Sequence, residues 1–305
     1  MLSHTQNVSH TVKQFLRRSS GKTQNILSKF EKISSITIGL PLRLCYATKA
    51  SEESQKTAPS VDLENIEVMK KLAQTWWDLT GDLKPLHAMN HVRVPFIRDG
   101  LVATGKVKDP KGGRDILKGM DILEIGCGGG ILTEALARLH ANVTAIDPAE
   151  ELIEVAKLNA EKSPEIQKRI TYLTQTIEDH VLENVEKYDA VILSEVIEHV
   201  NDQENFIRHS INSLKSGGSI FLSTFNKTFL SYWLGIFVAE NIIQAIPKGT
   251  HEWDKFISPQ EMQRLFEQNN CSVIQTSGLM YQPWNNTWTW CESLGITYIQ
   301  HAVKH

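Results

Sequence analysis

Three glycines in a short stretch and one aspartate further along have the residue types and spacing to hold a nucleoside. Residues 121–130 read Asp-Ile-Leu-Glu-Ile-Gly-Cys-Gly-Gly-Gly, an apolar run that ends in the glycines 126, 128 and 130. A backbone without side chains lets a ligand approach closely at such a turn. Asp147 ends the next apolar run, where its carboxylate can accept hydrogen bonds from both hydroxyls of a ribose. The pattern therefore predicts a nucleoside site that includes Gly126, Gly128 and Asp147.

The residues around this turn favour S-adenosylmethionine over a dinucleotide. A dinucleotide fingerprint has the order G-x-G-x-x-G, whereas this turn has G-x-G-x-G and Ile131 stands where the third glycine would be. Glu124 places a negative charge before the turn, which suits a cationic sulfonium and ammonium and disfavours a pyrophosphate. We therefore expect S-adenosylmethionine as the cofactor, with an NAD-dependent dehydrogenase as the disfavoured alternative.

Two carboxylates and an imidazole follow a later apolar run. If a helical turn begins there, Glu195, Glu198 and His199 stand at positions i, i+3 and i+4 on one face. Such a set can ligate Mg²⁺, which would lower the pKa of a bound phenol and hold two neighbouring oxygens. His199 acting as a base without metal, and an ordinary helix start with acids favoured by the dipole, are the alternatives. His251 is a further polar candidate to face a substrate.

Alternating strands and helices position these residues. Apolar runs predict strands at 121–125, 142–146, 170–174, 188–193, 218–224, 272–279 and 296–302. Helical patterns and caps predict helices at 90–103, 131–139, 149–162, 202–214 and 258–269. The alternation predicts an α/β fold with a mostly parallel sheet covered by helices on both faces. The ligand then lies beyond the carboxyl ends of strands one, two and four, and a loop at 176–179 brings Glu178 beside the adenine.

The first fifty residues differ in charge from the rest of the chain. Of 32 basic and 35 acidic residues, eight basic and one acidic lie in 1–50, which leaves 24 basic and 34 acidic residues for the body. An acidic body argues against nucleic acid as a partner. A basic, hydroxyl-rich and acid-poor N-terminus predicts a mitochondrial transit peptide, with a disordered basic tail as the alternative. Residues 51–61 read as a polar linker, and 62–305 as one domain that begins with a helical cap over 62–103.

An aromatic insertion is expected between the fifth strand and the next helix, at about 227–257. Its apolar run is interrupted by Glu240 and Asn241, so it is too short to span a bilayer. An aromatic segment of this kind usually belongs to the hydrophobic core. At the rim of a site it is also a candidate lid that covers a lipid tail or rests on a membrane surface.

Five short motifs resemble the ubiquinone-biosynthesis O-methyltransferase family, and the resemblance covers about residues 65–302. They are Trp76-Trp-Asp-Leu79, Lys84-Pro-Leu-His87, the glycine run Leu123 to Leu132, Glu195-Val-Ile-Glu-His-Val200 and Pro247-Lys-Gly-Thr-His251. The resemblance implies a seven-stranded, Rossmann-like class I methyltransferase fold. It also implies O-methylation of catechol-like polyprenyl intermediates, namely a dihydroxy-polyprenylbenzoate and demethylubiquinol.

The same resemblance implies roles for individual residues. The family's contacts to the methyl donor fall here on Arg93, Gly126, Asp147 and Ser194. Its magnesium ligands, described for mitochondrial members, fall on Glu195, Glu198 and His199. Bacterial members often have methionine in place of Ser194, so only a backbone or van der Waals contact is carried over to that residue.

The resemblance also implies a cellular setting. It places the protein peripherally on the matrix side of the inner mitochondrial membrane, in a complex with other ubiquinone-synthesis proteins. An O-methyltransferase with a soluble acceptor and a non-catalytic nucleotide-binding scaffold remain the alternative functions.

Overall fold

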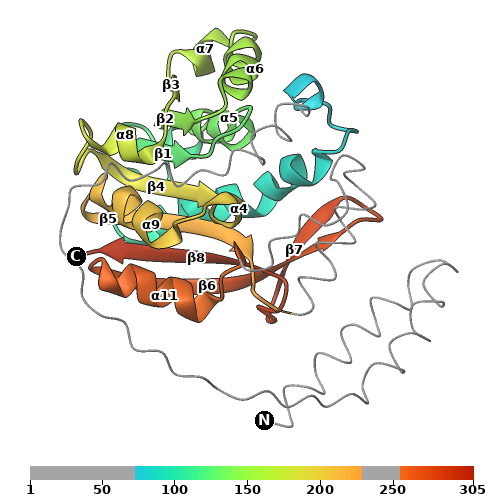
Figure 1. The fold of residues 1–305 in the computed structure, drawn as a ribbon. Helices are drawn as coiled ribbons and strands as arrows, with labels where there is room; N and C mark the ends of the chain where they lie inside the picture. Colours follow the sequence, from blue (N-terminus) through green and yellow to red (C-terminus); the bar gives the residue numbers. More distant parts are fainter. Residues whose placement is uncertain (1–72, 229–254) are drawn as a thin grey trace, which may run out of the picture. The chain divides into compact units, whose positions relative to one another are not determined.

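The computed structural model describes residues 73–228 and 255–305, whose centre is a sheet of eight strands (Figure 1). The strand order is β3-β2-β1-β4-β5-β8-β6-β7. The first five strands are parallel, β8 is antiparallel to β5 and to β6, and β7 is antiparallel to β6. The strands are β1 Asp121–Ile125, β2 Asn142–Asp147, β3 Ile170–Thr174, β4 Tyr188–Ser194, β5 Leu214–Phe225, β6 Cys271–Gln282, β7 Thr287–Cys291 and β8 Thr297–Lys304.

The described helices alternate with the parallel strands, as the sequence predicts. They are α4 Lys84–Ala103, α5 Ile131–Ala137, α6 Glu150–Ala160, α7 Pro164–Gln167, α8 Ile177–Val181, α9 Gln203–Asn212 and α11 Pro259–Gln268, with 3₁₀ turns η1 Ala73–Thr75, η2 Gly113–Asp115 and η3 Ile197–His199. Ser258 caps α11 in a capping box with Glu261, so the expected hydroxyl cap is present. Helix α4 begins six residues before the predicted start, because Pro85 occupies its first turn, where proline is tolerated.

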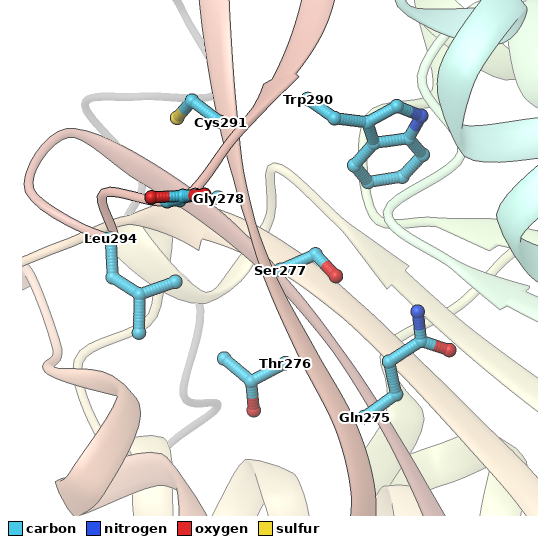
Figure 2. A pocket seen from close by; sticks show the side chains of 8 residues that line it. Gln275, Thr276, Ser277, Gly278, Trp290, Cys291 and Leu294 are labelled. Atoms are coloured by element: carbon cyan, nitrogen blue, oxygen red, sulfur yellow. The ribbon is translucent and has the colours of Figure 1, made fainter.

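One strand of the sheet is absent from the sequence-based prediction. β7 forms a hairpin with β6, and the extra strand makes the sheet eight-stranded where the family resemblance implies seven. Trp288 and Trp290 stand two positions apart and so share one face of β7, where Trp288 is buried and Trp290 remains about half exposed. A cavity of about 640 Å³ lies along this edge, lined by residues of β6, of the end of β7 and of the loop after it (Figure 2).

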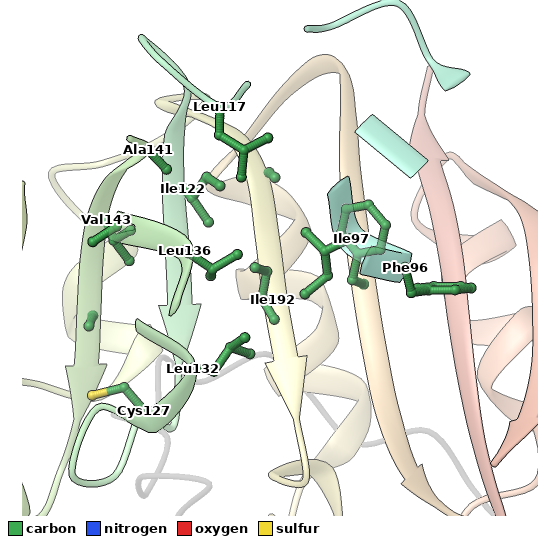
Figure 3. Close-up of a cluster of buried hydrophobic side chains, with 14 of the residues drawn as sticks. Phe96, Ile97, Leu117, Ile122, Cys127, Leu132, Leu136, Ala141, Val143 and Ile192 are labelled. Atoms are coloured by element: carbon green, nitrogen blue, oxygen red, sulfur yellow. The ribbon is translucent and has the colours of Figure 1, made fainter. Parts of the chain in front are cut away.

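Each face of the sheet has its own hydrophobic core, because the central strands carry apolar side chains on both of their faces. On one face, Ile122 and Ile192 meet Leu132 and Leu136 of α5 and Ile97 of α4 (Figure 3). On the other face, residues of β1, β4, β5 and β8 pack against α9 and α11. Fully burying one such side chain contributes about 1.5–3 kcal/mol, so both layers are strongly held to the sheet.

Three local predictions were wrong in detail. Residues 215–217, which separate the predicted helix 202–214 from the predicted strand 218–224, lie within β5, where Gly217 has a φ of +69°. Residues 177–179, expected as loop, begin α8, because Thr176 accepts a hydrogen bond from the Asp179 N–H as a cap. The expected helical cap is interrupted by turns between η1 and α4.

Several expectations lie outside the described residues. These are the transit peptide 1–50, the linker 51–61, the start of the helical cap, His251 and nearly all of the insertion 227–257. Within the two described ranges, no helix has the length and apolar character needed to cross a bilayer.

Candidate functional site

The glycine turn lies between β1 and α5, at the point where the strand order reverses. Gly126, Gly128 and Gly130 have φ values of +72°, +52° and +87°, which side-chain-bearing residues rarely adopt. The turn is also crowded. A Cβ at Gly126 would lie 2.5 Å from Cγ2 of Val196, and one at Gly130 would lie 2.4 Å from Oη of Tyr172. Glycine is therefore required here both by backbone conformation and by contact.

Asp147 at the end of β2 faces the glycine turn, so two of the predicted elements do meet. Its Oδ2 accepts the N–H of Gly128 and its Oδ1 accepts the N–H of Ala149, both at 2.9 Å. The side chain is buried, and burial raises its pKa, although the two N–H donors and the nearby His199 counteract that change. The carboxylate is thus held in place beside the turn by two backbone donors.

Glu124 is buried in the last part of β1, before the turn. Thr133 Oγ1 donates to its Oε2 at 2.5 Å, and burial raises the pKa of Glu124 to about 7. The charge of Arg93 lowers that pKa, while the charge of Asp147 raises it. The predicted negative charge before the turn is therefore partly neutralised by Arg93 in the free protein.

Arg93 connects α4 to the strand ends. Its Nη1 donates to Oγ of Ser194 at 2.9 Å, and its Nε donates to Oδ1 of Asn90 at 2.7 Å. Burial lowers the pKa of this guanidinium to about 10, while Glu124 and Glu195 raise it. It remains charged at neutral pH, so one buried cation stands among several carboxyls.

A chain of hydroxyls leads from Arg93 to the first residue after β4. Ser194 Oγ lies 2.9 Å from Ser223 Oγ, and Ser223 Oγ donates to Oε1 of Glu195 at 2.8 Å. Ser194 and Ser223 are register partners on β4 and β5, which places both side chains at the same edge of the sheet. Glu195 itself has a φ of +55°, a backbone conformation that few non-glycine residues adopt.

Glu198, in η3, forms an electrostatically coupled pair with Glu195. Its Oε2 accepts the hydroxyl of Thr224 at 2.8 Å, and burial raises its pKa to about 7. Burial and repulsion from Glu198 raise the pKa of Glu195 to about 8. Two neighbouring carboxyls with such high proton affinity form a site suited to a proton or a cation.

His199 does not complete a three-residue metal site with this pair. Among the residues that the structure describes, no three His, Cys, Asp or Glu side chains come together in a way that could hold a metal. The helical register assumed for the three residues fails because Glu195 precedes η3 in a left-handed conformation. The imidazole of His199 instead lies near Asp147, whose pKa it lowers.

The remaining candidates occupy other positions. Glu178 lies in α8 after β3, and its charge acts on His209 of α9. The cavity along β6 and β7 contains none of the predicted site residues (Figure 2).

Sequence reasoning missed several members of this site. Asn90, Ser223 and Thr224 orient the charged groups, but each is an ordinary polar residue in the sequence. The positions of Ser223 and Thr224 near the end of the fifth strand were the available signal, because the carboxyl ends of parallel strands meet at one edge. Trp76, which packs on the glycine turn, was noted only as part of a family motif.

The fold and the site define a class I methyltransferase, an enzyme that takes its methyl group from S-adenosylmethionine. Residues 99–276 match the family model described as "Methyltransferase domain". The structure of magnesium protoporphyrin IX methyltransferase from Synechocystis PCC 6803 with bound SAM has the same fold. Its TM-score is 0.52 at 18% identity, and the alignment covers 80% of this chain and 99% of that one.

Proteins of similar sequence identify the family within this class of methyltransferases. The mitochondrial ubiquinone biosynthesis O-methyltransferase of Rattus norvegicus is 44% identical over 269 residues, which are 88% of this chain and 77% of that protein. The ubiquinone biosynthesis O-methyltransferase of Methylobacterium sp. (strain 4-46) is 39% identical over 251 residues, 82% of this chain and 98% of that protein. The chain belongs to the ubiquinone biosynthesis O-methyltransferase family and is an S-adenosylmethionine-dependent O-methyltransferase, which confirms the resemblance found in its motifs.

Proposed function

We propose that this chain transfers the methyl group of S-adenosylmethionine to a phenol oxygen of a prenylated catechol or quinol in ubiquinone synthesis. Membership of the family supports this reaction and this substrate class. The observation that carries the proposal is the pair Glu195 and Glu198, which lies beyond β4 close to the glycine turn. O-methylation needs a group that takes the phenol proton, and this pair has the required proton affinity.

The methyl donor would bind over the glycine turn. Gly126 and Gly128 would accept the nucleoside against their backbone, and Asp147 would bind the ribose hydroxyls. Each carboxylate oxygen has two lone pairs, so Asp147 can accept these hydroxyls in addition to its two backbone N–H groups. Arg93 and Ser194 would border the donor on the β4 side, and Glu178 would lie toward the adenine.

Methyl transfer would begin when the phenol gives its proton to the carboxylate pair. The phenolate oxygen then attacks the methyl carbon in line, and the carbon–sulfur bond breaks with its electrons passing to sulfur, which leaves a neutral thioether. An ordinary glutamate is a weak base for a phenol of pKa about 10. A pKa of about 8 at Glu195 narrows that gap. Ser223 fixes this carboxylate, and Arg93 fixes the serines in turn.

Magnesium could bind here with fewer protein ligands than the three that the sequence predicts. Mg²⁺ is often held by only one or two carboxylates together with water and substrate oxygens, so Glu195 and Glu198 fit its chemistry without His199. These two residues would hold the ion, which would act as a Lewis acid that lowers the pKa of the phenol. Without the ion, His199 and His251 are the other candidate bases.

The insertion is proposed as the cover for the prenyl tail. Phe225, just before it, stacks on Phe256 at its end, with ring centroids 5.6 Å apart. The Gln203 side chain donates to the carbonyls of Ile197 in η3 and of Lys255. The two ends of the insertion therefore meet beside the carboxylate pair, which supports a role at the acceptor.

The cellular setting is proposed on two grounds. The relative in Rattus norvegicus is named a mitochondrial protein, and residues 1–50 have the composition of a transit peptide. We propose peripheral association with the matrix side of the inner membrane, together with other ubiquinone-synthesis proteins and without nucleic acid.

The proposal is tested by methyl transfer from labelled S-adenosylmethionine to dihydroxybenzoates with and without a short prenyl chain. We expect transfer to the prenylated acceptor, and its loss in Glu195→Gln and Glu198→Gln with binding of S-adenosylhomocysteine retained. Equal rates with the acceptor that lacks a tail would favour a soluble acceptor instead. Donor binding without transfer to either acceptor would favour the scaffold function.

A further inference from the structure

Trp76 packs directly on the glycine turn. A Cβ added at Gly128 would lie 2.4 Å from Cζ2 of its ring, and one added at Gly129 would lie 2.7 Å from its Nε1. The indole is only 5% exposed and belongs to a small cluster that includes Ile131 and Ala149, at the starts of α5 and α6. The ring is therefore fixed by packing against the elements that form the donor site.

The indole N–H of Trp76 has no hydrogen-bond partner within the described part of the chain. This is unusual, because a buried tryptophan N–H normally finds an acceptor. Two other tryptophans follow that rule: Trp77 Nε1 donates to the carbonyl of Gly129 at 2.9 Å, and Trp288 Nε1 donates to that of Pro85 at 2.8 Å. A rigid, buried N–H group that lacks an acceptor, at a turn proposed to bind a ligand, is typical of a group that donates a hydrogen bond to that ligand.

We propose that Trp76 is a donor-binding residue whose N–H gives a hydrogen bond to an oxygen of S-adenosylmethionine. The oxygens of this methyl donor are those of its methionyl carboxylate and those of its ribose. The ring would close the turn from outside, and the N–H would become satisfied only when the donor is bound. This inference rests on the proposed position of the donor over Gly128 and beside Asp147.

The test compares Trp76→Phe with Trp288→Phe in the full chain. Both variants lose the same ring volume from a buried position, but Trp288→Phe loses an N–H that is already bonded to protein. Calorimetric titration with S-adenosylhomocysteine should show a five- to twentyfold rise in Kd for Trp76→Phe and less than a twofold change for Trp288→Phe. The melting temperature of the free protein should fall more in Trp288→Phe than in Trp76→Phe.

A second ligand identifies the acceptor oxygen. 5′-Methylthioadenosine keeps the ribose and lacks the carboxylate, so a penalty in Trp76→Phe with both ligands supports a ribose oxygen. A penalty with S-adenosylhomocysteine alone supports the carboxylate. Unchanged affinity for both ligands in Trp76→Phe would overturn the inference, whereas a wild-type chain that binds neither ligand would overturn the proposed donor site itself.

Discussion

Replacing Glu195 by glutamine should change how the stability of the free protein depends on pH. Burial and repulsion from Glu198 hold the pKa of Glu195 near 8, and burial holds that of Glu198 near 7, compared with 4.5 for an ordinary glutamate. Between pH 5 and 8 the folded protein therefore keeps protons that the unfolded chain has released. Because the native state binds more protons in this window, stability falls as the pH rises through it.

The size of the effect follows from the same values. One pKa unit corresponds to about 1.4 kcal/mol, so the rise of the Glu195 pKa from 4.5 to about 8 sets an upper limit of about 5 kcal/mol. Glu195 is partly exposed to solvent, and part of its pKa shift comes from the neighbouring charge of Glu198. We therefore expect a smaller change in the free energy of unfolding, about 2 kcal/mol. Glutamine cannot ionise, yet its amide oxygen can still accept the hydroxyl of Ser223. The variant and the wild type should match near pH 5, and the variant should be more stable at pH 8.

The measurement is urea unfolding followed by tryptophan fluorescence at several pH values, with the shift in midpoint converted through the m-value. Glu165→Gln is the control, because its carboxylate lies at the surface in an ion pair with Lys168 and its pKa is lowered. This control should gain no stability relative to the wild type as the pH rises. A difference between Glu195→Gln and the wild type that stays constant from pH 5 to 8 would refute the reasoning.

Three further predictions concern the methyl donor, the stability of the glycine turn and the metal. Asp147→Asn should raise the Kd for S-adenosylhomocysteine about tenfold in calorimetry, because an amide loses the charge-assisted bonds to ribose. Gly126→Ala should destabilise the protein by about 2 kcal/mol or more in thermal melts, because of the positive φ at this position and the contact with Val196. Gly105→Ala is the control: its φ is +73° and nothing lies within 4 Å of the added Cβ, so it should lose only the stability that the backbone strain costs. A chelator should abolish methyl transfer and spare donor binding, and full activity in chelator would assign proton removal to the protein alone.

Four of the five parallel strands, β1 to β4, could be predicted to within one residue. β1 and β3 have the predicted bounds, because strands buried on both faces read as short apolar runs between turn signals. β7 was missed, since Thr287-Trp-Thr-Trp-Cys291 is an aromatic segment of only five residues. Only its pairing with β6 makes it a strand, and such pairing is a property of the tertiary structure.

The sequence predicted which residues belong to the site better than it predicted how they are arranged. Spacing placed Glu195, Glu198 and His199 on one helical face, but a left-handed residue at the start broke that register. The partners that decide the geometry are Ser223 and Thr224, more than 25 positions away in the chain. Local periodicity contains no information about contacts at that separation.

The charges of the site explain why it can bind a cationic donor after folding around buried acids. Glu124, Asp147, Glu195 and Glu198 all have raised pKa values, and Arg93 is the cation that balances Glu124 and Glu195. The free protein relieves the excess negative charge by binding protons, since burying an unpaired carboxylate is costly. A sulfonium or ammonium placed among these groups would stabilise their ionised forms and displace protons. At the proposed donor site, the same electrostatic excess that lowers the stability of the free enzyme would therefore favour the charged donor over its neutral thioether product.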